Sequence, residues 1–289
     1  MGLLDGLDSL GLSGIENISL YEEEKKNTEN EDAKEKAAPV KEVKETDFLY
    51  DKTFECPVCG NKFKQRVVRS NSVKMIAQDK DLRPIYEHVD LNKYEVVLCE
   101  RCGYASLIRF HAALPKPFRD LIRQNISARF SPPAPLGETI SYEQAMVRYK
   151  MALLNAVVRK GKSSEKAFIC LKMAWLYRSM NDAIEKDPRI PAELKAKKRE
   201  AYKVQEIEYL KNAREGFIKA RTAENTPYAG MNEVTLDYLI GVLSIETGVG
   251  EKDALRLLQT VAVSVNATKI QKERSVELIQ VLKNKLKEE

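Results

Sequence analysis

Four cysteines in the first half of the chain have the types and spacing of a metal site. Two C-x2-C pairs, in ECPVCGNKF and LCERCGYAS, are separated by 39 residues. A two-residue spacer lets both thiolates of a pair face one ion, and two such pairs complete the tetrahedral shell of Zn²⁺. Each pair is followed by a glycine, Gly60 or Gly103, which suits a tight turn with positive φ. The sequence therefore predicts a zinc site with the ligands Cys56, Cys59, Cys99 and Cys102.

Four sulfur ligands close the coordination shell, whereas a catalytic zinc keeps a position open for water and usually has three protein ligands. The two histidines, His88 and His111, lack ligand spacing to either cysteine pair. No phosphate-binding glycine loop and no convincing Ser-His-Asp set is present in the sequence. We therefore expect a structural zinc ion in a protein that is not an enzyme. A thiol or zinc redox sensor is the alternative, because CPVC resembles a dithiol motif.

The composition is that of a soluble globular protein, with 43% hydrophobic and 31% charged residues. No segment approaches the roughly 18 consecutive apolar residues of a membrane span. The N-terminal segment lacks the basic stretch of a secretory signal, so we expect a cytoplasmic protein without a membrane span. A reducing cytoplasm favours metal binding by paired cysteines over disulfide formation.

Composition divides the chain into four segments. Residues 1–50 carry 13 Asp or Glu against 6 Lys or Arg, although the whole chain has a net charge of +5. Because residues 22–47 are almost all Glu, Lys, Asn, Ala and Thr and cannot bury enough apolar surface to fold, we expect 1–47 to be a disordered acidic arm, with docking of its leucine-bearing tip as the alternative. Residues 48–110 carry β-branched and aromatic runs around the cysteine pairs, which predict a zinc-ribbon-like module. Within it, residues 71–93 are polar and are expected to be irregular. Residues 111–140 form a connecting segment with one helix.

Helical periodicity begins at Ser141, which forms a plausible capping box with Gln144. Apolar spacing predicts helices at about 141–158, 164–180, 192–221, 232–247, 251–265 and 269–287. Paired helices with short breaks are typical of repeat stacks, and the tetratricopeptide repeat is the nearest template. The predicted fold is therefore α+β: a small zinc-ribbon-like β module followed by an all-α, tetratricopeptide-like helical-repeat domain at 141–289. An ordinary helical bundle is the alternative for the second part.

The runs FECPVCGNKFK, QDKDLRPIY, YEVVLCERCGYAS and AFICLKMAWLYR occur in this order within residues 48–250. In this arrangement the chain resembles the bacterial family of unknown function DUF2225. The resemblance implies a zinc-ribbon-like N-terminal part and a tetratricopeptide-like C-terminal part. It implies no activity, cofactor chemistry or partner.

Helical repeats form concave surfaces that suit extended partners, so the predicted function is a zinc-stabilised adaptor that binds a protein or peptide. The residues expected in its groove are Tyr149, Asn155, Tyr177 and Arg178. The alternative is a nucleic-acid-associated regulator, because a basic β surface can follow phosphates. The residues expected to bind nucleic acid are Lys62, Lys64, Arg66 and Arg69.

Overall fold

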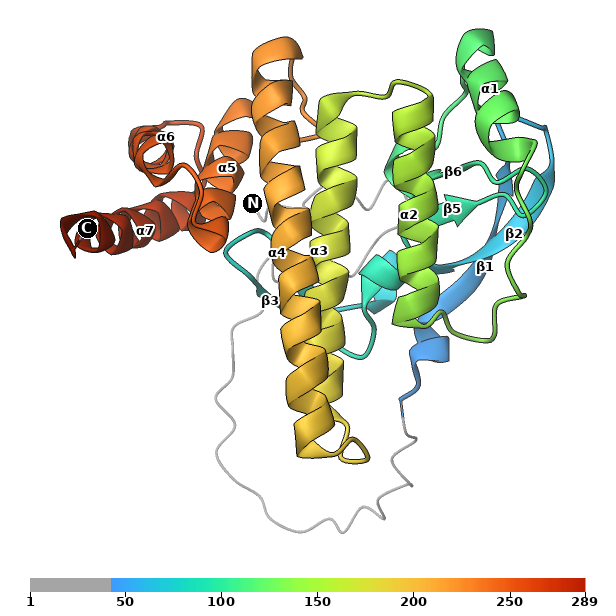
Figure 1. Cartoon of the computed structure of the whole chain (residues 1–289), viewed down its shortest axis with the longest axis horizontal. Coiled ribbons are helices and arrows are strands. Elements are labelled where there is room, and N and C mark those ends of the chain that lie inside the picture. The colour runs from blue at the N-terminus through green and yellow to red at the C-terminus, as the bar shows by residue number, and fades with distance from the viewer. Residues whose placement is uncertain (1–42, 289) are drawn as a thin grey trace, which may run out of the picture. The chain divides into compact units, whose positions relative to one another are not determined.

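Three antiparallel hairpins form the β part of the protein, which we describe from a computed structural model for residues 43–288 (Figure 1). The paired strands are β1 (Leu49–Glu55) with β2 (Lys62–Val68), β3 (Met75–Gln78) with β4 (Pro84–Tyr86), and β5 (Val96–Leu98) with β6 (Ala105–Leu107). The first and third hairpins carry the cysteine pairs, as the sequence predicts. The expectation that residues 71–93 are irregular is wrong, because they contain β3 and β4. The sequence of these two strands lacks the alternation of apolar and polar residues that marks a strand, because all four residues of β3 are exposed and its pairing with β4 is interrupted by an irregularity.

Seven α-helices follow in the part of the chain that the structure describes. They are α1 (Lys116–Ile122), α2 (Tyr142–Val158), α3 (Ser163–Lys186), α4 (Ala192–Ala223), α5 (Glu233–Thr247), α6 (Glu251–Val263) and α7 (Lys269–Glu288). The capping box of α2 is confirmed, because Gln144 N donates to Ser141 Oγ at 3.2 Å and Ser141 N donates to Gln144 Oε1 at 2.9 Å. The α+β fold class is confirmed by the hairpins and the helical region that follows them.

Helices α2, α3 and α4 lie side by side, and α2 also packs against β5 and β6 (Figure 1). Two glycines permit close helix packing: a Cβ on Gly216 of α4 would lie 2.8 Å from Ala167 Cβ, and one on Gly241 of α5 would lie 2.8 Å from Leu258 Cγ. The 15-residue α5 and 13-residue α6 fit a repeat of about 34 residues per helix pair. In contrast, α3 and α4 have 24 and 32 residues and exceed that template.

A continuous hydrophobic core joins the hairpins to the helices. It contains Leu98 and Leu107 from the third hairpin together with Tyr149, Trp175 and Phe217 from the helices. Residues from the segments predicted at 48–110, 111–140 and 141–289 therefore share this core, whereas α6 and α7 pack with α5 in a second hydrophobic cluster. Among the described residues, no helix has the length and apolar character to cross a membrane.

Most of the predicted acidic arm, residues 1–42, lies outside the described residues. Its last part is ordered, since Glu45–Phe48 forms a 3-10 turn. The Glu45 carboxylate accepts a hydrogen bond of 2.7 Å from the Tyr94 hydroxyl and pairs with Lys93 Nζ at 2.6 Å. Glu45 is thus held by the buried Tyr94 and the half-buried Lys93.

Candidate metal centre

The four cysteine sulfurs form one compact cluster. Cys56 Sγ lies 3.5 Å from Cys102 Sγ, and Cys59 Sγ lies 3.6 Å from Cys99 Sγ. All four sulfurs lie within 4.8 Å of one another. A regular tetrahedron with metal–sulfur distances of about 2.3 Å has sulfur–sulfur edges of about 3.8 Å, whereas a disulfide bond is about 2.05 Å long. The cysteines are free thiols placed to hold one metal ion from four sides.

Two turns of matching geometry present the sulfurs. Gly60 N donates to Cys56 O and Gly103 N donates to Cys99 O, each at 2.9 Å. Both glycines have a φ of 71°, which explains why glycine follows each pair. Their surroundings differ: a Cβ on Gly103 would lie 2.6 Å from Phe130 Cγ, whereas a Cβ on Gly60 would meet nothing within 4 Å. The first turn is therefore open and the second is enclosed.

The segment predicted as a connection holds both cysteine turns from outside. Helix α1 continues into a π-helical turn, Arg123–Ser127, whose residues contact the backbone of each turn. Arg123 Nη2 donates to Val58 O at 2.7 Å, and Ser127 Oγ donates to Cys102 O at 2.7 Å. Ile122 and Ile126 pack against the cysteines in one buried cluster. This segment positions the metal centre as well as linking two regions.

The sulfurs influence one another's ionisation. Hydrogen bonds from Cys102 and then Cys56 lower the pKa of Cys99 to about 2, against the opposing effect of burial. Hydrogen bonds with Cys56 and Cys99, followed by burial, raise the pKa of Cys102. The cluster thus favours one thiolate and disfavours the next. A bound cation supplies the positive charge that several adjacent thiolates require.

The donor set decides which metals fit. Four thiolates in a tetrahedral arrangement suit Zn²⁺, which has no geometric preference of its own and is commonly held by four cysteines in structural sites. Cys56, Cys99 and Cys102 are buried, and Cys59 is half-buried. No histidine ring lies in the cluster, and His111 instead lies against Phe54, with its Nε2 3.0 Å from Glu55 O.

A family model described as "Uncharacterized protein conserved in bacteria (DUF2225)" matches residues 49–286, which include the cysteine cluster and nearly all of the helical region. The chain belongs to the DUF2225 family. No curated protein and no solved structure matches it. The predicted resemblance is confirmed and covers more of the C-terminal region than the sequence runs indicated.

Two residues predicted in a partner groove of this DUF2225 protein lie in its core. Tyr149 and Asn155 are both 0% exposed, so neither is available to a partner on this surface. Asn155 Nδ2 donates to Gly103 O at 3.0 Å and to Met151 O at 2.9 Å. It therefore supports the second cysteine turn. The prediction misplaced both residues because apolar spacing alone does not tell which face of α2 is covered.

The other two residues of the predicted groove lie on α3. Tyr177 is half-buried and packs between Tyr202 and Tyr209 of α4, with ring centroids 5.8 Å away in each case. The neighbouring Arg178 faces carboxylates: its Nη1 lies 3.0 Å from Asp81, and its Nε lies 2.7 Å from Glu206. The guanidinium also contacts Asp79 and Glu246, at 3.1 and 3.2 Å.

The turn between β3 and β4 lies against the helical region, and side chains of the helices hold it there through hydrogen bonds and ion pairs. Trp175 Nε1 donates to Asp81 Oδ2 at 2.8 Å, and Asp81 is 0% exposed. Arg274 of α7 donates to Gln78 O at 2.8 Å, and the Tyr238 hydroxyl donates to Lys80 O at 2.9 Å. Arg178 thus binds a segment of its own chain. We define residues 78–83 as the docked turn.

The docked turn is not evident from the sequence. Its partners lie between 94 and 196 residues further along the chain, and the acids of QDKDLR resemble those of any solvated loop. One useful indication was present, because Lys172 and Arg178 interrupt the apolar run of α3. Cations within a buried helix generally require carboxylate partners.

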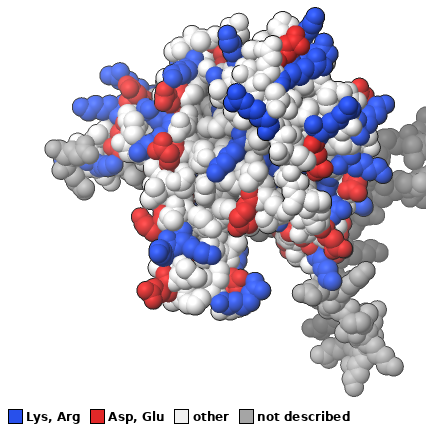
Figure 2. Space-filling model, turned by 45° about the vertical axis from the view of Figure 1, so that its right-hand side comes forward, with Lys and Arg blue, Asp and Glu red and all other residues white. Residues whose placement is uncertain are grey.

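The basic residues predicted to contact nucleic acid lie on β2 and just after it. Across the first hairpin, Lys62 pairs with Glu55 at 4.0 Å and Arg66 pairs with Asp51 at 3.4 Å. Lys64 is exposed, and Arg69 lies 5.9 Å from the ring centroid of Tyr50. Basic and acidic side chains are likewise interspersed on the face shown in Figure 2. Strand β1 therefore offsets part of the predicted positive surface.

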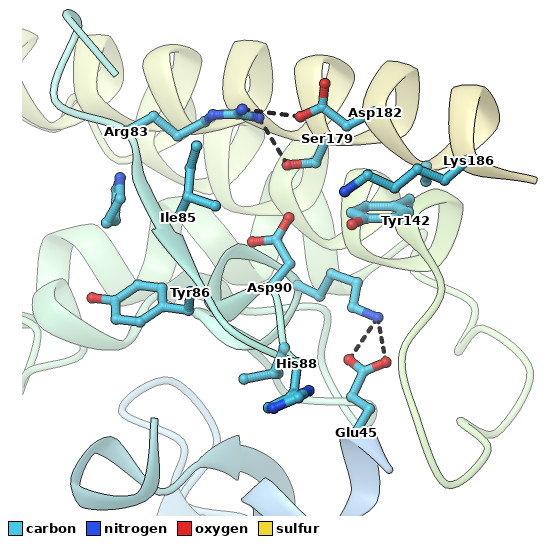
Figure 3. A pocket seen from close by; sticks show the side chains of 14 residues that line it. Glu45, Arg83, Ile85, Tyr86, His88, Asp90, Tyr142, Ser179, Asp182 and Lys186 are labelled. Carbon is cyan, nitrogen blue, oxygen red and sulfur yellow. Dashed lines mark hydrogen bonds and ion pairs between the residues drawn. The ribbon is translucent and has the colours of Figure 1, made fainter. Parts of the chain in front are cut away.

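A cavity of about 290 Å³ lies between β4 and helices α2 and α3 (Figure 3). Arg83 lines it and donates to Asp182 Oδ2 at 3.0 Å and to Ser179 Oγ at 3.2 Å. Lys93 pairs with Glu45, as described above. The carboxylates of Asp182 and Glu45 neutralise these two cations, whereas Lys186, which also lines the cavity, forms no ion pair with a described residue.

Proposed function

We propose that this DUF2225 protein is a non-enzymatic adaptor stabilised by a structural zinc ion. The four-sulfur cluster supports the structural role, because four cysteine ligands leave no position on zinc for water or substrate. Backbone contacts from Arg123 and Ser127 further restrain the turns that carry the sulfurs. Zn²⁺ joins the first hairpin to the third and thereby stabilises the surface on which α2 packs.

The docked turn is the observation that carries the adaptor proposal. Helices α3, α5 and α7 contact both its backbone carbonyls and its aspartate side chains, which is how helical-repeat surfaces bind extended segments. Arg178 and Trp175 supply donors to the acidic side chains, and Arg274 supplies donors to the carbonyls. The partner is a protein whose acidic turn competes with residues 78–83 for these donors.

A peptide-binding experiment tests this mode of recognition. In a full-length variant, residues 79–82 are replaced by Gly-Ser-Gly-Ser, which removes both docked aspartates. A fluorescent peptide of residues 75–86 should bind this variant saturably and bind the unaltered protein weakly, since the latter holds its own turn in place. The same peptide with both aspartates changed to asparagine is the matched control and should bind about tenfold or more weakly, because hydrogen bonds to charged groups are lost.

Affinity purification from the native cell, with and without nuclease, then tests for the partner. The variant with the replaced turn should enrich a protein that nuclease treatment does not remove. The adaptor proposal is wrong if a folded variant binds neither the peptide nor any protein reproducibly. Enrichment that disappears with nuclease would instead favour the nucleic-acid alternative.

A further inference from the structure

Arg148 of α2 is a buried cation without a carboxylate partner. It is 3% exposed, and its Nη2 donates to Val96 O at 3.1 Å and to Gln65 Oε1. Its Nε forms no hydrogen bond, and neither Nε nor Nη1 donates to any residue between 43 and 288. The guanidinium therefore has donors to spare inside the protein.

The other buried cations of the described chain differ from Arg148. Arg83 pairs with Asp79 at 2.7 Å, and Lys172 pairs with Glu95 at 2.8 Å. A buried charge that lacks a counter-charge is strongly unfavourable, so proteins rarely keep one without a use. Burial lowers the pKa of Arg148 to about 10, although the charge of Glu100 acts in the opposite direction without forming an ion pair with the guanidinium. An anionic ligand would stabilise the buried charge of Arg148.

A cavity of about 210 Å³ opens beside Arg148, between β2, β5 and residues 135–140. Its apolar lining comes from Phe63, Leu98, Pro135, Leu136 and Ile140. Its charged lining comprises three cations and two carboxylates, which leaves one positive charge in excess. The Arg66–Asp51 ion pair accounts for one of each sign. The cavity thus has apolar and polar walls and is cationic where Arg148 lies.

We propose that this cavity binds a small organic monocarboxylate whose carboxylate pairs with the guanidinium of Arg148 and whose apolar body contacts Leu98 and Leu136. The planar guanidinium matches the two oxygens of a carboxylate. A single negative charge balances the excess of the lining, whereas a phosphate dianion would leave a net negative charge in the cavity. Apolar side chains beside convergent polar groups are typical of small-molecule sites. This site is independent of the adaptor proposal.

The test compares 3-methylbutanoate with its uncharged isostere 3-methylbutanamide by ligand-observed NMR on the zinc-loaded full chain. The carboxylate should bind about tenfold or more tightly than the amide, because charged hydrogen bonds are stronger than neutral ones. Arg148→Met should abolish this preference. Leu136→Trp fills the cavity while keeping Arg148, so it should abolish binding even if Arg148→Met does not fold.

Arg129→Met is the matched control, because Arg129 is exposed and does not line the cavity. It should leave the preference for the carboxylate unchanged. Equal binding of carboxylate and amide would overturn the proposal, as would an unchanged preference in a folded Arg148→Met variant. Tighter binding of inorganic phosphate than of 3-methylbutanoate would overturn the assignment to a monocarboxylate.

Discussion

Alanine substitutions at Gly60 and Gly103 separate backbone strain from steric crowding in the two cysteine turns. Both residues have a φ of 71° and follow the second cysteine of a pair. An alanine in this left-handed region costs about 1–2 kcal/mol relative to glycine. Because the φ values are equal, this cost should be the same in both turns. Any difference in the free energy of unfolding between the two variants then reflects the atoms packed around each glycine.

The packing around each glycine predicts that Gly103→Ala lowers the free energy of unfolding more than Gly60→Ala does. A Cβ there would lie 2.6 Å from Phe130 Cγ and 3.1 Å from Ile126 Cγ2, whereas a Cβ on Gly60 meets nothing within 4 Å. Forcing an extra carbon into a packed interior typically costs about 1–3 kcal/mol. We therefore expect Gly60→Ala to lower the free energy of unfolding by about 1–2 kcal/mol and Gly103→Ala by about 2–5 kcal/mol.

Urea denaturation of the zinc-loaded proteins measures both losses, with zinc content determined in parallel. Phe130→Ala should recover part of the loss caused by Gly103→Ala, since it removes Cγ and Cδ2, the ring atoms nearest the new methyl group, and a double-mutant cycle isolates that coupling. Equal losses at the two glycines, or no coupling with Phe130, would refute the argument that the second turn is sterically enclosed.

Two further perturbations address the metal and a buried carboxylate. Cys99→Ser or chelation should remove bound zinc and lower the free energy of unfolding by about 4 kcal/mol or more. Cys170→Ser changes a buried cysteine outside the cluster and should leave the zinc content unchanged. Full zinc content in Cys99→Ser would contradict the proposed site. Burial and then Asp81 raise the pKa of Glu246 to about 7 from its ordinary 4.5, although its side chain keeps 28% exposure. The folded state therefore binds this proton more tightly than the unfolded state, so stability should fall as pH rises between about 5 and 7. Glu246→Gln should flatten that part of a urea-midpoint profile, and an unchanged slope would contradict this assignment.

The metal site and most helices follow from local patterns in the sequence. The spacing within each C-x2-C pair and the glycine after it already define the turn, so the ligands could be named before the fold was known. Helices α2 to α7 were predicted because apolar spacing and residues such as Ser141 mark their faces and starts. The prediction for α3 ended too early, near 180, because its last turns are polar and largely exposed.

Long-range contacts escaped prediction because nothing local encodes them. The docked turn has Leu82 at a φ of 70°, a conformation that its residue type does not indicate. Tyr149 was assigned to a surface because its apolar helix face was read without knowing that the third hairpin covers it. Arg148 was overlooked for a similar reason: a single arginine in an amphipathic helix is normally solvated, and only the packed structure encloses it.

The continuity of the core between the third hairpin and the helices has a practical consequence. Cutting the chain near residue 140 would strip α2 of the hairpin it covers and expose Leu98 and Leu107 on the other fragment. It would also part Arg178 and Trp175 from the aspartates they bind. Neither fragment would keep a complete hydrophobic core, so the two halves of this protein have to fold together.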